Sequence, residues 1–452
     1  MTLCSFVLLS AINTGLLLFL IRKRGWVSSE GLCAMYLLAM VVTDNLEVFV
    51  RAYWWPETLP LGPDEINLRI YPTMVHIAGI VALLVGLHVA DPRPRSISRL
   101  LGRNELRTLA RIGGCLVVIG AIMYGTVLYL VGATTLGAHA LDTIWNGERS
   151  VAGFWYRGID IMLVGALLLF VSLRGYWRAI AAAAAVAFPV LMTHNKGGLE
   201  KSLLWAAFVC YAYQKRQFRA FFRAATTWMI WVPVAVLLVI LTVGAKNYYL
   251  ANGGSVNATE SLMSGLDSVR ARYSADGLYR GYSQMVTYMR NGSAEYFQGR
   301  LLSYTLTGWV PGFIYQNKPN HPTHDTGYMI YSDHHSYASD ASAFTLVGLA
   351  YSDFGVVSVV SYLLVGGLVL GRMRRAAIRS GGSLYYHVGY VFVCLFGACN
   401  SESGFMDFIY VCVFAAVAMG LTWIALGLFS PAIRRGRLIT RGTLQEVGAH
   451  RY

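Results

Sequence analysis

The chain has 452 residues, of which 56% are hydrophobic and only 13% are charged. Its apolar residues fall into repeated runs of roughly 16 to 28 residues, long enough for helices to cross a hydrocarbon layer of about 30 Å. The formal net charge of +14 is spread over the connections between these runs and does not indicate a nucleic-acid partner. We therefore predict an all-α polytopic membrane protein.

Taken in chain order, the apolar runs predict about eleven transmembrane helices. The first run has no small-residue cleavage pattern and is followed by RKRGW, which indicates a retained helix and not a removed signal. The predicted spans are residues 3–21, 31–51, 72–90, 112–132, 155–173, 178–193, 198–213, 228–246, 343–371, 384–400 and 404–429.

Alternate connections differ in their content of Lys and Arg. One set holds 24 of the 37 basic residues, although the other set contains the longest loop. Because cytoplasmic connections attract Lys and Arg, the basic set is predicted to be cytoplasmic. The N-terminus is then outside and the C-terminus inside. The basic set comprises residues 22–30, 91–111, 174–178, 214–223, 372–383 and 430–452.

The seven cysteines lie in or at the edges of the predicted spans and show no CxxC or Cys/His spacing. They therefore give no signal of a disulfide or a metal site. Packing of small, soft side chains is the interpretation we favour.

One connection, between the eighth and ninth predicted helices, is much longer than the rest. It covers residues 247–342 and divides the chain into helices 1–8 (1–246), a cap on the outer side, and helices 9–11 with a cytoplasmic tail (343–452). Its six basic and seven acidic residues nearly balance, as in a small folded unit. Two short amphipathic helices are predicted inside it. Their apolar faces are Leu262, Leu266, Val269 and Tyr273 in the first, and Leu278, Tyr282, Met285 and Met289 in the second.

Three arginines of this loop lie off the two apolar faces and are candidates for binding an anion, since guanidinium groups bind phosphate oxygens in pairs. They are Arg270, Arg272 and Arg280. The alternative is that they are solvated surface residues. Lys196, in the tight turn 194–198, is either a further anion contact or a snorkelling interfacial lysine.

A histidine-rich stretch ends the loop, where 309–351 holds four of the ten histidines of the chain. The stretch contains potential metal ligands, but their spacing lacks a helical pair. They are His321, His324, Asp325, Asp333, His334 and His335. Alternatively, one histidine deprotonates a substrate hydroxyl, because its usual pKa is close to neutrality.

The order of these features resembles the Wzy-type O-antigen and oligosaccharide repeat-unit polymerases over about residues 190–370. The resemblance rests on the basic turn, the large outer loop, Arg280, and Gly299 followed by two leucines. VPGFIYQNKP at 310–319 and AFTLVGLAYSDFG at 343–355 complete it. The chain departs from the family pattern at Gly312 and Lys196, where arginine is usual.

The resemblance implies a metal-independent, cofactor-free, inverting glycosyltransferase of the bacterial inner membrane. Its active site and the 247–342 cap would lie at the periplasmic face, with the N-terminus periplasmic and the C-terminus cytoplasmic. It would transfer a growing glycan from undecaprenyl diphosphate onto another lipid-linked repeat unit, with membrane lipid and a chain-length regulator as further partners. Cations would stabilise the diphosphate and a base would activate the acceptor hydroxyl. The predicted residues are Arg270, Arg272, Arg280, Lys318 and Lys196 on phosphate, His321 or His324 as base, and Asp325 as an orienting group.

Three alternatives stay open at this point. An O-antigen ligase would transfer a finished chain to a lipid A core and use the same cations and base. A polyprenyl-monophosphate sugar transferase would place its N-terminus in the cytoplasm. A transporter or flippase would carry charged residues and broken helices near the middle of the membrane.

Overall fold

A computed structural model of the chain describes residues 2–24, 45, 48, 63–91, 103–131, 158–173, 177, 259–260, 262–266, 278–307, 310, 314–316, 346–379, 420 and 424. Across these residues the structure is helical and contains no strand, which confirms the predicted helical class for this part of the chain. The helices are α1 (Thr2–Arg24), α3 (Pro63–Ala90), α4 (Arg103–Val131), α7 (Gly158–Ser172), α13 (Leu278–Arg290), α14 (Arg300–Thr307), α16 (Leu346–Phe354) and α17 (Val356–Arg379).

Three helices are long and apolar enough to cross a membrane, which supports the predicted membrane protein. Their candidate spans are Ile66–Ala90 in α3, Leu106–Thr126 in α4 and Val356–Ala376 in α17, and α1 adds a shorter apolar run, Cys4–Leu16. The total of eleven spans and the domain limits at 246 and 342 stay predictions. Six predicted spans fall outside the described residues except for isolated positions: 31–51, 178–193, 198–213, 228–246, 384–400 and 404–429.

Glycines bring α3 and α17 into backbone contact. A Cβ atom on Gly86 would meet the carbonyl oxygen of Leu364, and one on Gly367 would meet the backbone of α3. A Cβ on Gly79, two turns earlier in α3, would lie 2.9 Å from the Val359 side chain. Contacts therefore advance in the same direction along both helices, so α3 and α17 are parallel. Small residues allow this close approach between helices in a membrane.

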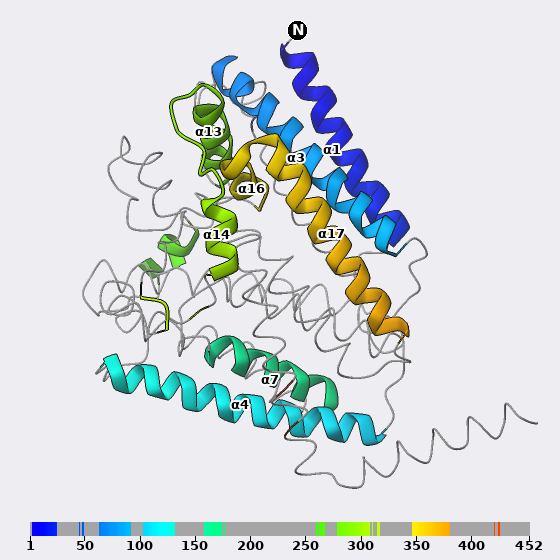
Figure 1. Cartoon of the computed structure of the whole chain (residues 1–452), viewed down its shortest axis with the longest axis vertical. Helices are drawn as coiled ribbons and strands as arrows, with labels where there is room; N and C mark the ends of the chain where they lie inside the picture. The colour runs from blue at the N-terminus through cyan, green and yellow to red at the C-terminus, as the bar shows by residue number, and fades with distance from the viewer. Residues whose placement is uncertain are drawn as a thin grey trace, which may run out of the picture.

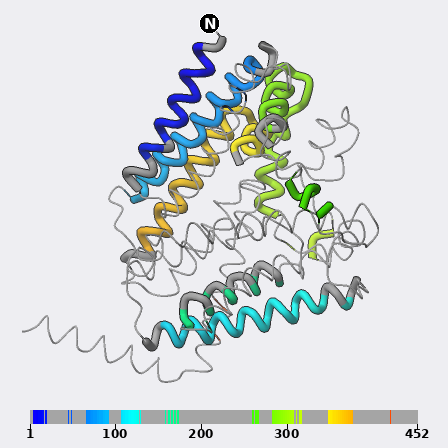
Figure 2. Tube along the Cα trace, turned by 180° about the vertical axis from the view of Figure 1, so that it is seen from behind, coloured from blue at the N-terminus to red at the C-terminus, as the bar shows by residue number. Residues whose placement is uncertain are grey.

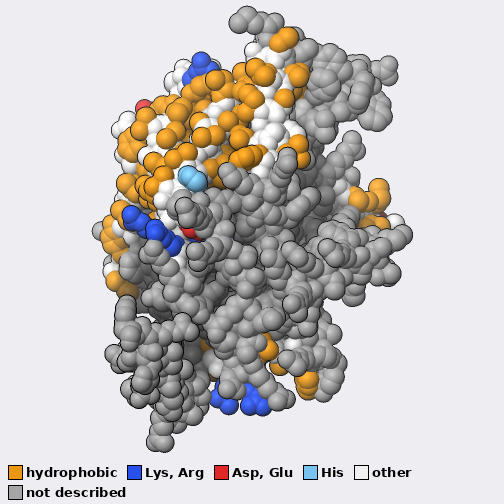
Figure 3. Space-filling view, turned by 90° about the vertical axis from the view of Figure 1, so that its right-hand side faces the viewer, with side chains coloured by type: hydrophobic (Ala, Val, Ile, Leu, Met, Phe, Trp, Pro, Cys, Tyr) orange, Lys and Arg blue, Asp and Glu red, His pale blue; other side chains and the backbone are white. Residues whose placement is uncertain are grey.

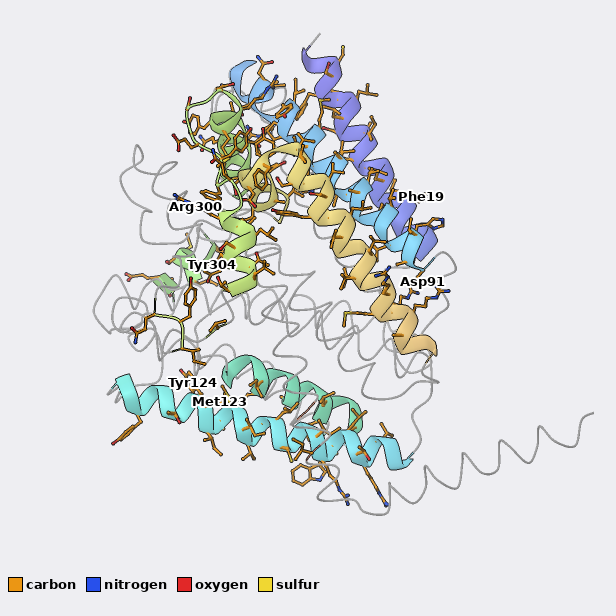
Figure 4. The ribbon with its side chains drawn as sticks, in the orientation of Figure 1. Phe19, Asp91, Met123, Tyr124, Arg300 and Tyr304 are labelled. Carbon is orange, nitrogen blue, oxygen red and sulfur yellow. The ribbon has the colours of Figure 1, made fainter. Side chains whose placement is uncertain are left out.

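The helix α1 lies beside α3 and runs in the same direction (Figure 1). Figure 4 places Phe19, late in α1, at the same end of the bundle as Asp91, which follows α3. Three parallel helices agree with the predicted order, in which spans 3–21, 72–90 and 343–371 all run from the outer to the inner face. A small apolar cluster joins the other ends: Phe6, Val48, Ile66 and Ile70.

The second close pair is α4 with α7, and this pair is antiparallel. A Cβ on Gly113 would lie 2.7 Å from the Gly165 carbonyl oxygen, and one on Gly120 would meet the Gly158 carbonyl. The glycines in each helix are seven residues apart and thus share one face. The predicted spans 112–132 and 155–173 cross in opposite directions, as this pair does.

The helices α13 and α16 lie at the amino-terminal end of α3 and α17, and α14 leads away from α16 (Figures 1 and 2). We name this end of the bundle the α13 end. On the face drawn in Figure 3, hydrophobic side chains cover most of the described surface and Lys and Arg appear at its margins. That distribution suits contact with lipid between two polar boundaries.

Two predicted boundaries differ from the structure. The helix α3 begins at Pro63, nine residues before the predicted span 72–90, because proline is well suited to a first helical position and the interior Pro72 does not end the helix. The predicted span 343–371 is divided into α16 and α17 at Gly355, which has a φ of 67°. That left-handed conformation is favourable for glycine and ends α16.

Candidate functional site

The predicted second amphipathic helix of the large loop is present as α13, and its apolar face is buried at the α13 end. Tyr282, Met285, Val286 and Met289 are all at most 2% exposed. The Tyr282 hydroxyl donates a 2.8 Å hydrogen bond to the carbonyl oxygen of Pro72 in α3. Because this phenol is completely buried, the bond fixes both the position and the rotation of α13 against α3.

The C-terminal end of α13 is closed by a tight turn. Backbone N–H groups of Ser293 and Ala294 donate to the carbonyl of Tyr288 at 2.8 and 3.2 Å, and Gly292 has a φ of 74°. This is the left-handed arrangement in which helices commonly end. Arg290, in the last turn, is therefore held on a rigid element near the start of α3, where its positive charge also complements the helix dipole.

Three tyrosines and one arginine meet at this point, and we call them the tyrosine–arginine cluster: Tyr71, Arg290, Tyr296 and Tyr351. The Arg290 guanidinium carbon lies 4.1 Å from the centre of the Tyr71 ring. The rings of Tyr71 and Tyr351 are 6.4 Å apart and nearly perpendicular, and those of Tyr296 and Tyr351 are 5.9 Å apart. The distances are those of attractive aromatic and cation–π contacts. Four separate segments of the chain supply the four residues.

The hydroxyl groups of the cluster are joined to one another. Tyr296 donates to the Tyr351 hydroxyl at 3.2 Å, and Tyr71 also hydrogen-bonds with Tyr351. Tyr351 thus joins Tyr296 and Tyr71 through its hydroxyl group.

Asp353, the last residue but one of α16, holds the segment between α13 and α14. Its Oδ1 accepts hydrogen bonds from the backbone N–H of Gly299 at 2.7 Å and of Leu301 at 3.4 Å. Its Oδ2 accepts from the Tyr362 hydroxyl of α17 at 2.6 Å. Asp353 is completely buried, and one carboxyl group thereby links α14, α16 and α17. It also caps the first turn of α14, whose N–H groups have no partner within that helix.

Backbone hydrogen bonds reinforce this connection. Phe297 N–H donates to the Ser352 carbonyl at 2.8 Å, and Gln298 N–H donates to the Asp353 carbonyl at 3.1 Å. Gly299 has a φ of 92°, a value that a side chain would oppose, and it turns the chain into α14. Along α14, Arg300 and Tyr304 mark the direction that leads away from α16 (Figure 4).

Polar residues also lie inside the bundle. Arg69, Thr73 and His76 of α3 are completely buried, and their spacing of four and three residues puts them on one helical face. The His76 ring is 6.0 Å from the ring of Tyr282 and nearly perpendicular to it. His76 is near the middle of the candidate span Ile66–Ala90. Ionisable groups at such depth are costly in lipid and often functional.

At the opposite end, Arg374 of α17 is 3.6 Å from a carboxyl oxygen of Asp91. Both side chains are at most 10% exposed, so the pair is largely removed from water. It ties the end of α3 to α17, far along both helices from the tyrosine–arginine cluster. The contact is a structural link and not part of the candidate site.

Of the eight predicted site residues, only Arg280 lies in the described part of the chain, where it occupies the first turn of α13. Its backbone is therefore positioned at the start of α13, as the amphipathic pattern predicted. The remaining seven lie outside the described residues, and their roles stay predictions: Lys196, Arg270, Arg272, Lys318, His321, His324 and Asp325.

The sequence interpretation did not single out Asp353, Tyr71, Tyr296 or Tyr351, and it left Arg290 as a surface residue. A partial signal existed for Asp353, an acid followed by an aromatic residue and a glycine at the end of an apolar run. The tyrosines gave none, because interfacial tyrosine is common in membrane helices.

No protein-family model, curated protein or solved structure matches this chain.

Proposed function

We propose that the chain is a polysaccharide polymerase that transfers a growing glycan from a polyprenyl diphosphate onto a second lipid-linked repeat unit. One observation carries the proposal: α13 is fixed at the end of two apolar spans by the buried bond from Tyr282 to Pro72. This contact places Arg280 and Arg290 on a rigid helix where the apolar part of α3 begins. A diphosphate attached to a lipid chain lies at that boundary, and fixed arginines suit it.

The proposed reaction uses residues of the large loop 247–342 and Lys196 of the turn 194–198. The acceptor hydroxyl oxygen attacks the anomeric carbon of the donor, and the bond from that carbon to the diphosphate oxygen breaks. His321 or His324 takes the hydroxyl proton, and Asp325 orients the histidine or the sugar. Arg270, Arg272, Arg280, Lys318 and Lys196 stabilise the negative charge that the departing diphosphate gains. In this proposal the α13 end faces the periplasm.

The test uses the purified full-length chain in nanodiscs, supplied with lipid-linked repeat units from cells that lack the gene. A polymerase yields a ladder of lipid-linked glycans that differ by one repeat. We expect Arg280→Ala and His324→Ala to reduce polymer formation by at least about a hundredfold, the scale of a lost oxyanion contact or general base. Arg372→Ala, an exposed arginine of α17 at the Asp91 end, is the matched control and should retain activity.

Other outcomes are equally informative. If both variants polymerise at the wild-type rate, the assigned chemistry is wrong. If the chain leaves repeat units unchanged but joins a completed glycan to a supplied lipid A core, it is a ligase. His321→Ala, measured in the same assay, decides which histidine acts as the base.

A second candidate function, a transporter or flippase of lipid-linked oligosaccharides, is favoured by the complete burial of His76 near the middle of the candidate span Ile66–Ala90. Polar groups near mid-membrane are typical of transport sites. Proteoliposomes discriminate between the two functions. A transporter moves a labelled lipid-linked repeat unit between leaflets and loses this activity in His76→Ala, whereas a polymerase forms product in nanodiscs, which have no second compartment.

A further inference from the structure

Arg290 differs from an ordinary surface arginine in how it is held. Its side chain is exposed, yet its guanidinium carbon lies over the Tyr71 ring, 4.1 Å from the ring centre. Among the described residues, no carboxyl group forms an ion pair with it. The ring covers one face of the guanidinium, and no described residue accepts a hydrogen bond from its N–H donors, which lie in the plane of the group and are available to a ligand.

The surroundings of Arg290 are rigid. Tyr71 is packed against Tyr351 and Tyr351 against Tyr296, and the Tyr351 hydroxyl is hydrogen-bonded with those of Tyr296 and Tyr71. The turn at Gly292 fixes the end of α13 from which Arg290 extends. An arginine held in this way loses little conformational freedom on binding, which favours affinity.

The depth of the cluster indicates the kind of ligand. The candidate span Ile66–Ala90 has 25 residues and is about 37 Å long as a helix, about 7 Å more than the hydrocarbon layer. Tyr71, five residues after Ile66, therefore lies close to the boundary of that layer. Tyrosine and arginine at such depth are typical of the layer that contains lipid phosphate groups. A planar guanidinium binds two phosphate oxygens at once, which a point charge does not.

We infer that the tyrosine–arginine cluster is a phosphate-binding site, in which Arg290 binds the phosphate group of a lipid. This inference rests on the proposed function for the source of the phosphate, because the group belongs either to the polyprenyl diphosphate substrate or to a bulk anionic phospholipid. Arg290 is then a substrate-positioning residue additional to the arginines predicted from the sequence. Tyr71 supports it through the ring and not through its hydroxyl.

Equilibrium binding of radiolabelled farnesyl diphosphate to the full-length chain in phosphatidylcholine nanodiscs tests the inference. Arg290→Gln should weaken binding roughly ten- to a hundredfold, the range expected for a lost charged hydrogen-bonding pair. The matched control is Arg300→Gln, which removes the same charge from an exposed position ten residues away and should change binding by less than about threefold.

Two further pairs of variants test the geometry. Tyr71→Phe retains the ring and should bind as the wild type does, whereas Tyr71→Leu should bind as weakly as Arg290→Gln. Arg290→Lys keeps the charge without the planar fork and should be intermediate. Should Arg290→Gln fail to fold, as judged by thermal melting, the lysine variant and the Tyr71 pair give the same test.

The inference is overturned if Arg290→Gln binds as tightly as the wild type, or if the Arg290 and Arg300 variants weaken binding equally. Adding phosphatidylglycerol to the nanodiscs separates the two sources of phosphate. If phosphatidylglycerol weakens farnesyl diphosphate binding to the wild type but not to Arg290→Gln, the site binds bulk phospholipid. If phosphatidylglycerol leaves the affinity of the wild type for farnesyl diphosphate unchanged, the site binds the diphosphate substrate.

Failure of this site and failure of the proposed function give different results. A chain that makes no polymer but loses diphosphate binding in Arg290→Gln has the site without the function. A chain that polymerises, with Arg290→Gln and Arg300→Gln equally active, has the function without the site.

Discussion

Replacing Asp353 by alanine should release α14 from the helix bundle. The carboxyl group of Asp353 accepts hydrogen bonds at 2.6 Å from the Tyr362 hydroxyl and at 2.7 Å from Gly299 N–H, and a longer one from Leu301 N–H. A buried donor left without its acceptor costs about 1–3 kcal/mol. Two strong bonds would give about 2–6 kcal/mol. Tyr362 is only partly buried and can bond to water instead, so we expect about 3 kcal/mol for Asp353→Ala.

Hydrogen–deuterium exchange of the full-length protein in nanodiscs measures this loss locally. If α14 opens as a unit, a loss of about 3 kcal/mol corresponds to exchange of its amides roughly 150-fold faster. Asp353→Asn keeps one carbonyl oxygen for the Gly299 N–H and should lose about 1 kcal/mol. Tyr362→Phe removes one of the two strong bonds and should fall between these variants.

Ser361→Ala is the control, because the Ser361 hydroxyl bonds only to carbonyl groups of its own helix, at 2.7 Å to Val357 and 3.4 Å to Ser358. It should leave the exchange of α14 within about 0.5 kcal/mol of the wild type. Unchanged exchange across residues 300–307 in Asp353→Ala would refute the reasoning. The segment would then be held by its backbone hydrogen bonds alone.

Three further predictions concern stability, measured by thermal or detergent-induced unfolding. Gly86→Leu should lower the free energy of unfolding by at least about 2 kcal/mol, because its Cβ would meet the backbone of α17. Gly114→Ala is the control: its Cβ would meet nothing within 4 Å, so the free energy of unfolding should not change. Gly355→Ala should cost about 1–2 kcal/mol through its φ of 67°, and an unchanged midpoint would show that the break after α16 is not strained. Arg374→Gln should cost about 3 kcal/mol by leaving Asp91 buried without its ion pair. Adding Asp91→Asn should restore much of that loss, and strictly additive effects in the double variant would contradict the pairing.

The helices were predictable where one periodic pattern determines the structure. In α13 the predicted apolar face included Tyr282, Met285 and Met289, and all three are buried. The predicted apolar face was correct because an amphipathic helix such as α13 buries one side and exposes the other. Sequence periodicity did not reveal which helix α13 contacts.

The break at Gly355 was not predictable from hydropathy, because the residues on both sides of it are apolar and continue the same run. Neither was the role of Asp353, which depends on the backbone of Gly299, 54 residues earlier. A single sequence shows the composition of a segment but not the donors that a fold brings to it.

The candidate site was predictable only in its general chemistry. Arg280 was chosen from its position on an amphipathic helix, and the structure places that position at the start of α13. Arg290 is also an arginine of α13, but what distinguishes it is its contact with the ring of Tyr71 on α3. Contacts between distant elements of this kind do not follow from spacing along one of them.

The parallel contact between α3 and α17 also determines when the protein can become complete. Tyr282 and its partner Pro72 are 210 residues apart, and the face of α3 that carries Gly79 and Gly86 packs against α17, which is synthesised later still. Since chains are synthesised from the N-terminus, α3 enters the membrane before α17 exists, and it carries Arg69 and His76 into the membrane before the bundle that buries them is complete. A chain interrupted before residue 346 therefore lacks the helix that packs against α3, and we expect quality-control proteases to degrade such a product.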